Sequence, residues 1–207
     1  MRADDMDKPF SEACERNKAP ILQCLQPLYA ALHSVFEVGS GTGQHAVFFA
    51  SAMPHLRWQC SDMPAQLPGL RLWLEEAGLP NLPPPLAFGI GQPWPQWHCD
   101  AVFSANTLHI LGWEDVCGLF EGLGLWLPAH GLFTVYGPFN YGGRFTSEGN
   151  ARFDAALRAA DARRGLRDFE AVDALARAAG LALLEDRDMP ANNRCITWRR
   201  VAADGLR

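Results

Sequence analysis

Short runs of apolar residues alternate along the chain with longer stretches whose apolar positions recur at helical intervals. The first pair is a run over Val35–Gly39 and a stretch over Gly43–Met53, in which Ala46, Phe49 and Ala50 repeat with helical spacing. Alternation of this kind is typical of crossover units around a mostly parallel sheet. The pattern therefore predicts an α/β fold.

The same alternation continues to the end of the chain, with capping signals at several helix ends. We expect Gly78 to end the second helix, Asp168 to cap the start of the last helix, and Gly180 to follow its end. The predicted strands are Val35–Gly39, Leu56–Ser61, Leu86–Ile90, Asp100–Asn106, Gly131–Tyr136, Leu181–Asp188 and Arg194–Val201. The predicted helices are Gly43–Met53, Ala65–Ala77, Trp113–Leu127, Ser147–Asp161 and Asp168–Ala179. Without repeats or linkers, the pattern predicts one domain over residues 1–207, with a 35–207 core after an N-terminal segment 1–34.

Composition and charge narrow the class of protein. The 207 residues are 48% hydrophobic and 20% charged, as in an ordinary globular domain. A net charge of −5 argues against a large nucleic-acid footprint, and the basic run 162–167 is interpreted as a connector between helices. Six scattered cysteines with no CxxC pair favour a reducing compartment, and no residue spacing indicates a metal site. We expect no nucleic-acid partner and no metal.

The first residues are polar and acidic, which argues against a signal peptide. No apolar run approaches the roughly 20 residues that cross a bilayer. The sequence therefore predicts a cytoplasmic protein without a membrane partner.

Glycines follow the first predicted strand, where Val35–Gln44 reads VFEVGSGTGQ. Glycine allows a sharp turn and a close approach of the backbone to a ligand. Gly39, Gly41 and Gly43 have the spacing G-x-G-x-G, whereas a dinucleotide site normally has G-x-G-x-x-G. Gln44 occupies the sixth position, so this loop is more typical of another adenosine-containing cofactor.

Two acidic residues flank this loop in the predicted sheet. Glu37 precedes the first glycine, where it would suit the cationic amino-acid end of S-adenosylmethionine better than a pyrophosphate. Asp62 ends the second strand, where a carboxylate can accept hydrogen bonds from both ribose hydroxyls. The alternative is that the glycines only make a tight turn and that Asp62 caps the next helix.

At these residues the sequence resembles the class I S-adenosylmethionine-dependent methyltransferases. It is more closely similar to the family of methyltransferase-like protein twenty-six and its bacterial relatives, across nearly all the chain. The segments that carry the resemblance are Cys14–Leu22 (CERNKAPIL), Gly39–Ala46 (GSGTGQHA), Ser104–Ile110 (SANTLHI), Tyr136–Tyr141 (YGPFNY), Gly165–Glu170 (GLRDFE) and Met189–Asn193 (MPANN).

The resemblance implies a Rossmann-like fold with a seven-stranded sheet, one strand antiparallel, helices on both faces, and S-adenosylmethionine as cofactor. Relatives commonly carry an acidic residue where Gly89 stands, so adenine binding here would rest on backbone and apolar contacts, with Met63 packing the ring. The expected cofactor-binding residues are Arg16, Asn17, Glu37, Gly39, Ser40, Gly41, Gly43, Asp62, Met63, Gly89, Ile90 and Asn106.

Methyl transfer from a sulfonium is an in-line displacement, so alignment and deprotonation of the nucleophile dominate the protein's task. Asn106 and His109 follow the fourth strand, beside the expected methyl position. We consider His109 a candidate general base, because an imidazole with a pKa near 6.5 is useful at neutral pH. The alternative is that His109 only hydrogen-bonds the loop or the cofactor.

Further polar and aromatic residues follow the predicted sheet strands. Tyr141, which we also count among the catalytic candidates, lies in a group that could hold a methyl acceptor. The members of that group are Tyr136, Asn140, Tyr141 and Arg144, with Asn192 and Asn193 as further candidates or simple turn residues.

Three other regions have two interpretations. Glu15, Arg16 and Asn17 form either a lid over the cofactor carboxylate or part of a surface helix. His45 is interpreted as a packing or surface residue rather than a ligand. Trp94 and Trp97 either line an adenine or acceptor pocket or belong to an aromatic core.

These residues predict methyl transfer to an oxygen, nitrogen or sulfur atom of a small molecule. A protein methyltransferase would instead have an open groove for a peptide. A non-catalytic adaptor that retains the fold is suggested by Gly89 at the expected acidic position. An NAD-dependent oxidoreductase is disfavoured by the missing sixth-position glycine.

Overall fold

The computed structural model describes residues 8–202, which form two compact units that meet in the sequence at Gly89 and Ile90. Residues 1–7 of the expected N-terminal segment lie outside the described residues. The first unit contains α1 (Glu12–Tyr29), β1 (Ser34–Val38), α2 (Gln44–Ala52), β2 (Arg57–Asp62), α3 (Leu67–Ala77) and β3 (Leu86–Ala87). The second contains β4 (Ala101–Ala105), α4 (Trp113–Trp126), β5 (Leu132–Gly137), β6 (Phe139–Asn140), α5 (Glu148–Ala160), β7 (Arg167–Asp168), α6 (Phe169–Ala178), β8 (Leu181–Met189), a 3₁₀ turn (Pro190–Asn192) and β9 (Asn193–Arg200).

The strands form a seven-stranded sheet in the order β3-β2-β1-β4-β5-β9-β8. Strands β1, β2 and β3 pair in parallel, as do β4 and β5. Strand β9 is antiparallel to both of its neighbours, β5 and β8. The expected α/β fold, with one antiparallel strand in a mostly parallel sheet flanked by helices, is confirmed. No helix within residues 8–202 is long and apolar enough to cross a membrane.

The first unit packs its helices through residues that the apolar pattern had placed inside. Phe49 of α2 contacts Trp58 of β2, with ring centroids 5.4 Å apart, and both side chains are fully buried. Gly78 ends α3 in the left-handed conformation, as predicted. Ser11 caps α1 by accepting a hydrogen bond from the amide of Cys14.

The third strand is shorter than predicted. It ends at Ala87 rather than at Ile90, although the amide of Phe88 still donates to the carbonyl of Asp62 at 2.9 Å. Phe88 turns its ring into the core against Phe36, and Gly91 has a φ of +85°. The apolar run therefore continues through two buried residues, Phe88 and Gly89, that are not in a strand, and hydrophobicity alone does not distinguish them from strand residues.

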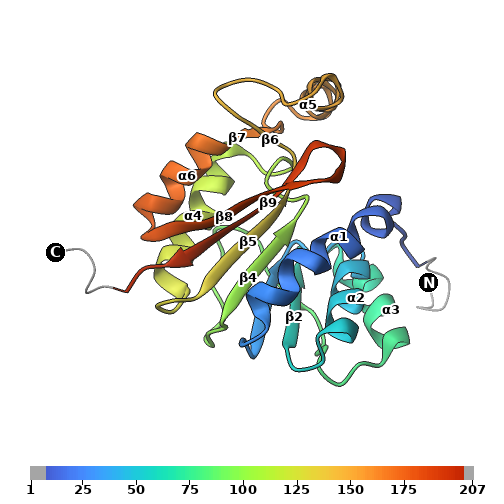
Figure 1. Cartoon of the computed structure of the whole chain (residues 1–207). Helices are drawn as coiled ribbons and strands as arrows, with labels where there is room; N and C mark the ends of the chain where they lie inside the picture. Colours follow the sequence, from blue (N-terminus) through green and yellow to red (C-terminus); the bar gives the residue numbers. More distant parts are fainter. Residues whose placement is uncertain (1–7, 203–207) are drawn as a thin grey trace. The chain divides into compact units, whose positions relative to one another are not determined.

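The second unit shows why α4 tolerates glycines. A Cβ on Gly122 would lie 2.1 Å from Nε1 of Trp94, and one on Gly124 would lie 2.8 Å from the carbonyl oxygen of Ala179. The missing side chains therefore let neighbouring segments approach the helix closely. In Figure 1, α4 and α6 lie side by side along the strands of this unit.

The start of α6 differs from the prediction in one respect. Asp168 occupies the N-cap position, but its side chain makes no capping hydrogen bond. Another acidic residue of the helix, Asp173, is buried and accepts a hydrogen bond from Nε1 of Trp198 at 2.9 Å. The predicted boundary is within one residue of the observed one, whereas the predicted capping contact is absent.

Candidate functional site

The three glycines after β1 share a left-handed backbone conformation, but the surroundings of Gly41 and Gly43 differ. Gly39, Gly41 and Gly43 all have positive φ, at 74°, 56° and 92°. A Cβ on Gly43 would lie 2.6 Å from Cδ1 of Leu70, so this glycine lets α2 pack against α3. A Cβ on Gly41 would meet no atom within 4 Å. Gly41 is therefore the glycine at which a ligand can approach the backbone.

Asp62 stands at the end of β2 and reaches this same glycine. Its Oδ2 accepts a hydrogen bond from the amide of Gly41 at 2.7 Å, and its Oδ1 accepts one from the amide of Met63 at 2.7 Å. Partial burial raises the pKa of Asp62, and the two amide hydrogen bonds oppose that shift. Each carboxylate oxygen has a second lone pair and can still accept a hydroxyl.

Glu37 lies beneath the glycine loop, 1% exposed. Its Oε2 accepts hydrogen bonds from Nε1 of Trp58 and from the hydroxyl of Ser40, both at 3.0 Å. Burial raises the pKa of Glu37 to about 7, and these two hydrogen bonds oppose the rise. The Glu37 carboxyl therefore helps to hold the glycine loop in position through its hydrogen bond with Ser40.

Ser40 continues this network to the neighbouring strand. Its hydroxyl accepts from the amide of Ser61 at 3.1 Å, and its own amide donates to the carbonyl of Ser61 at 3.0 Å. The hydroxyl of Ser61 donates in turn to the carbonyl of Glu37 at 2.6 Å. The loop is thus fixed by hydrogen bonds to β2, which pre-organises the backbone around Gly41.

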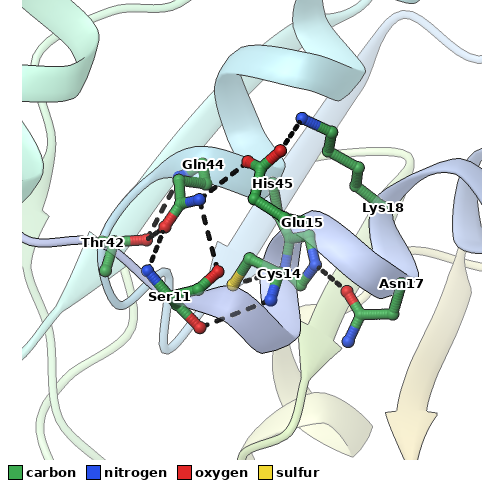
Figure 2. A network of polar contacts seen from close by, with 8 residues as sticks. All are labelled: Ser11, Cys14, Glu15, Asn17, Lys18, Thr42, Gln44 and His45. Carbon is green, nitrogen blue, oxygen red and sulfur yellow. Dashed lines mark hydrogen bonds and ion pairs between the residues drawn. The ribbon is translucent and has the colours of Figure 1, made fainter.

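Gln44, which occupies the sixth position of the glycine motif, connects α2 to the start of α1 (Figure 2). Its Oε1 accepts from the amide of Ser11 at 2.6 Å and from the hydroxyl of Thr42 at 3.0 Å. Its Nε2 donates to Oε1 of Glu15 at 2.8 Å, and Lys18 pairs with the other oxygen of Glu15. Sequence reasoning noted Gln44 only as a missing glycine and did not detect this role.

The remaining residues of the expected lid are engaged differently (Figure 2). Asn17 lies with Oδ1 2.6 Å from Nε2 of His45, while Sγ of Cys14 lies 3.8 Å from Nδ1 of the same ring. His45 is 5% exposed and stacks on Phe49, and burial lowers its pKa to about 4. Arg16 is exposed on α1. Residues 15–17 therefore belong to a helix docked on α2, and of the three only Arg16 faces solvent fully.

The residues expected around the adenine are spread over both units. Met63 is 52% exposed beside Asp62, so its side chain is available to a ligand. Gly89 is buried just after β3. In the second unit, Cγ2 of Ile90 lies 3.3 Å from the position of a Cβ on Gly118, so Ile90 packs against α4.

The second unit brings Asn106 and His109 together at the ends of β4 and β5. A Cβ on Gly137 would lie 3.6 Å from Nδ1 of His109 and 3.9 Å from Oδ1 of Asn106. Asn106 has a positive φ of 55°, and its amide donates to the carbonyl of Tyr136 at 2.8 Å. This strained backbone lies directly after a strand end, as is common at functional sites.

His109 is buried and held by neighbouring segments. Its ring lies edge-on to Phe153 of α5, and its carbonyl accepts from the amide of Gly165 at 3.0 Å. Burial, and to a smaller extent the positive charge of Arg167, lower the pKa of His109 to about 4. The imidazole is therefore neutral at pH 7, with a pKa below the value of 6.5 that a free histidine would have.

Arg167 is a buried residue that sequence reasoning assigned to a connector. Its guanidinium donates to the carbonyls of Leu108 and Leu111, on either side of His109, and to the carbonyl of Arg163. It is 8% exposed. A single basic residue thus fixes the loop that carries His109, a role that only the tertiary contacts reveal.

Tyr141 is tied to the C-terminal hairpin. Its hydroxyl donates to Oδ2 of Asp186 at 2.7 Å, its ring stacks on Phe169, and Arg194 lies over the ring. Burial and the Asp186 carboxylate raise the pKa of Tyr141 well above its usual range. These contacts favour an anchoring role for Tyr141 in the loop after β5.

The other polar candidates fall into three groups. Tyr136 is buried in β5 and Arg144 is exposed, pairing with Tyr141 through the backbone. Asn192 has a φ of 56°, and the side chain of Asn193 donates to the carbonyl of Pro190, so both shape the β8–β9 turn. Asn140 is buried at 9% exposure.

The tryptophans form a packed cluster within the second unit. Trp94 and Trp97 both contact Trp126, with ring centroids 4.9 Å and 5.9 Å apart. Nε1 of Trp126 donates to the carbonyl of Pro95 at 2.7 Å. Both residues therefore pack in an aromatic cluster with Trp126 of α4, which agrees with the interpretation of them as aromatic core rather than as the wall of a pocket.

Within residues 8–202 no group of three or more His, Cys, Asp or Glu side chains could hold a metal ion. A surface groove of about 600 Å³ lies along α4 and α6, with Phe120, Leu125 and Leu175 in its lining. None of the predicted site residues lines this groove.

The strand order and the glycine loop after β1 define a Rossmann-like fold of the class I methyltransferase type. An O-methyltransferase family protein from Burkholderia thailandensis has a TM-score of 0.81 at 16% identity, over 93% of this chain and 58% of that one. The S-adenosylmethionine-dependent methyltransferase SibL gives 0.77 at 23% identity, over 92% and 56%. The mitomycin 7-O-methyltransferase MmcR gives 0.81 at 16% identity, over 91% and 54%. The chain spans little more than half the length of these proteins.

The family assignment rests on a separate comparison. The chain belongs to the family described as "Protein of unknown function (DUF938)", which matches residues 8–200.

Proposed function

We propose that this protein transfers the methyl group of S-adenosylmethionine to an oxygen, nitrogen or sulfur nucleophile of a small molecule. The observation that carries the proposal is the Asp62 carboxylate, which is bonded to the amide of Gly41 beside open space. A carboxylate at the end of the second strand and an unobstructed glycine after the first suit a nucleoside ligand. The fold shared with methyltransferases supports the same reading.

The residues of the first unit fit this cofactor. Asp62 would accept the ribose hydroxyls with its remaining lone pairs, and Gly41 would let the ligand approach the backbone. Met63 would pack an apolar ring, while Glu37 and Ser40 hold the loop. When bound, S-adenosylmethionine supplies an activated methyl group and a neutral leaving group.

Residues of the second unit would serve the methyl acceptor. Neutral His109 can accept a proton from the nucleophile, and Asn106 beside it can orient the same group. The low pKa makes His109 a weak base, which suits an acceptor whose own proton is acidic. Tyr141 would position the loop through its bond to Asp186.

The proposal extends to relatives and location. The motifs of the chain support kinship with methyltransferase-like protein twenty-six, and its scattered cysteines support a reducing, cytoplasmic location. Its charge of −5 supports action on small molecules rather than on nucleic acid. Assays with peptides would reveal protein methylation instead.

Calorimetric titration with S-adenosylmethionine and S-adenosylhomocysteine tests the cofactor site. We expect micromolar binding by the wild type and a loss of about tenfold to a hundredfold in Asp62→Ala, because hydrogen bonds to a charged group contribute about 1.5–3 kcal/mol. Glu75→Gln, an exposed acidic residue of α3, is the control and should bind as the wild type does. Folded wild-type protein that binds neither ligand would contradict the proposal and favour the adaptor.

A further inference from the structure

Two polar atoms without partners lie on the short ladder formed by β6 and β7. Asn140 and Asp168 are register partners in this ladder, and Asn140 is about nine-tenths buried. Within residues 8–202, neither Oδ1 of Asn140 nor Oδ1 of Asp168, both buried atoms, has a hydrogen-bond partner. Such acceptors are rare in folded proteins, because each loses its hydration without compensation. Each of these atoms lacks a donor that a group from outside the chain would supply.

The position of Asp168 strengthens this point. An aspartate at the N-cap of a helix normally accepts a hydrogen bond from an amide of the first turn. Asp168 occupies that position in α6 without making the bond. Glu170, in the same turn, is also occupied elsewhere, since it accepts from the amide of Gly142 at 3.0 Å. The Asp168 carboxyl is therefore free of the role that its sequence position favours.

The ladder adjoins the loop that carries His109. Arg167, which precedes Asp168 in β7, donates to the carbonyls of Leu108 and Leu111. On the other strand, the segment leading to Asn140 starts at Gly137, whose Cβ would lie 3.6 Å from Nδ1 of His109. Both strands of the ladder are thus continuous with segments that contact the His109 loop.

We propose that Asn140 and Asp168 bind the amino group of an amine-bearing methyl acceptor, an inference that rests on the proposed function. An ammonium group is a donor only, with three N–H bonds, so it can satisfy both acceptors at once. A single hydroxyl carries one donor and leaves one acceptor unpaired. With the Asp168 carboxylate an ammonium forms a hydrogen bond between two ionised groups, whereas a hydroxyl offers only a neutral donor. The amine anchors the acceptor, and another atom of the acceptor receives the methyl group.

A matched pair of probes tests this assignment. Benzylamine and benzyl alcohol differ only in the amino and hydroxyl groups, and their affinities can be followed through the side-chain amide signal of Asn140 in NMR titrations of the full chain. We expect the amine to bind at least about tenfold more tightly, because of the charge-assisted bond. Asp168→Asn removes the carboxylate charge but keeps an acceptor oxygen, so it should lower the ratio by roughly threefold or more, whereas Glu148→Gln, at the start of α5, should leave it unchanged.

The outcomes separate this inference from the proposed function. Equal affinities in the wild type, as expected if a water molecule occupies the site, would overturn it, as would failure of both probes to bind. An amine preference that is undiminished in Asp168→Asn would do the same. If that variant does not fold, Asn140→Ala, followed through the amide of Asp168, replaces it. Loss of S-adenosylhomocysteine binding with the amine preference intact would remove the proposed function and leave the amine site.

Discussion

Glu37 shows how one buried carboxyl shapes the first unit. Trp58, Ser40 and Cys60 all direct donors toward its Oε2, yet burial still raises its pKa to about 7. The network orders the glycine loop. The buried Glu37 carboxyl at its centre is protonated more readily than an exposed one. A residue that the sequence marks as a cofactor contact is therefore also a determinant of stability.

This raised pKa makes the stability of the fold depend on pH. The ordinary pKa of 4.5 holds in the unfolded chain, so between pH 4.5 and about 7 the folded state keeps a proton that the unfolded state has lost. The contribution of Glu37 therefore falls as pH rises through this window, by up to about 3 kcal/mol, and is constant above it. Glu37→Gln abolishes this dependence.

Urea unfolding of both proteins at several pH values measures the effect. The stability of Glu37→Gln minus that of the wild type should rise between about pH 5 and about pH 7 and then level off. Buried His45 and His109 titrate in both proteins, so their contributions cancel in this difference. A flat curve for Glu37→Gln would contradict the raised pKa of Glu37.

At the scale of elements, glycines in helices have opposite consequences depending on their neighbours. Gly122 of α4 faces Trp94, which occupies the space of a Cβ, whereas a Cβ on Gly149 of α5 would meet only Oγ of Ser147 at 3.6 Å. Glycine lowers helix stability through backbone entropy in both places. Only at Gly122 does a tertiary contact require it.

The two glycines form a matched pair of substitutions. Gly122→Ala should destabilise the protein by about 1–3 kcal/mol, because the new methyl group displaces the Trp94 ring. Gly149→Ala should stabilise it by up to about 1 kcal/mol through helix propensity. Thermal unfolding monitored by tryptophan fluorescence measures both changes, and a Gly122→Ala variant as stable as Gly149→Ala would show that Trp94 is not packed there.

Some boundaries and contacts of the helices and strands agree with those predicted from the sequence, and others do not. The predicted helix Trp113–Leu127 and the observed α4, Trp113–Trp126, agree within one residue, since its apolar stripe and flanking residues act locally. The third strand is shorter than predicted, and Asp168 does not make the predicted capping hydrogen bond. Both features depend on tertiary structure. Phe88 packs against Phe36, which is distant in the sequence, and the Asp168 side chain does not adopt the capping geometry that its position favours.

At the scale of the whole molecule, the chain forms two compact units and one seven-stranded sheet. The sequence shows no linker at Gly89–Ile90, where the units meet in the chain. We therefore propose that residues 1–207 act as a single domain.

Cooperative unfolding follows from this proposal. Scanning calorimetry should give one transition whose calorimetric enthalpy equals the van't Hoff enthalpy. Two resolved transitions, or a ratio well above one, would mean that the units unfold independently. Under the proposed function, S-adenosylhomocysteine should raise the single transition temperature, because a ligand that binds only the folded state stabilises it.

The sequence by itself determined the α/β fold, most element boundaries, the glycine loop and the acidic residues beside it. These features depend on local periodicity and on residue types whose chemistry is independent of context. Tertiary structure alone decided that Glu37 lies beneath the loop, that Gln44 ties α1 to α2, and that Arg167 fixes the His109 loop. Each of these depends on burial and on partners distant in the sequence, because burial is set by the packing of the whole fold and not by the order of residues.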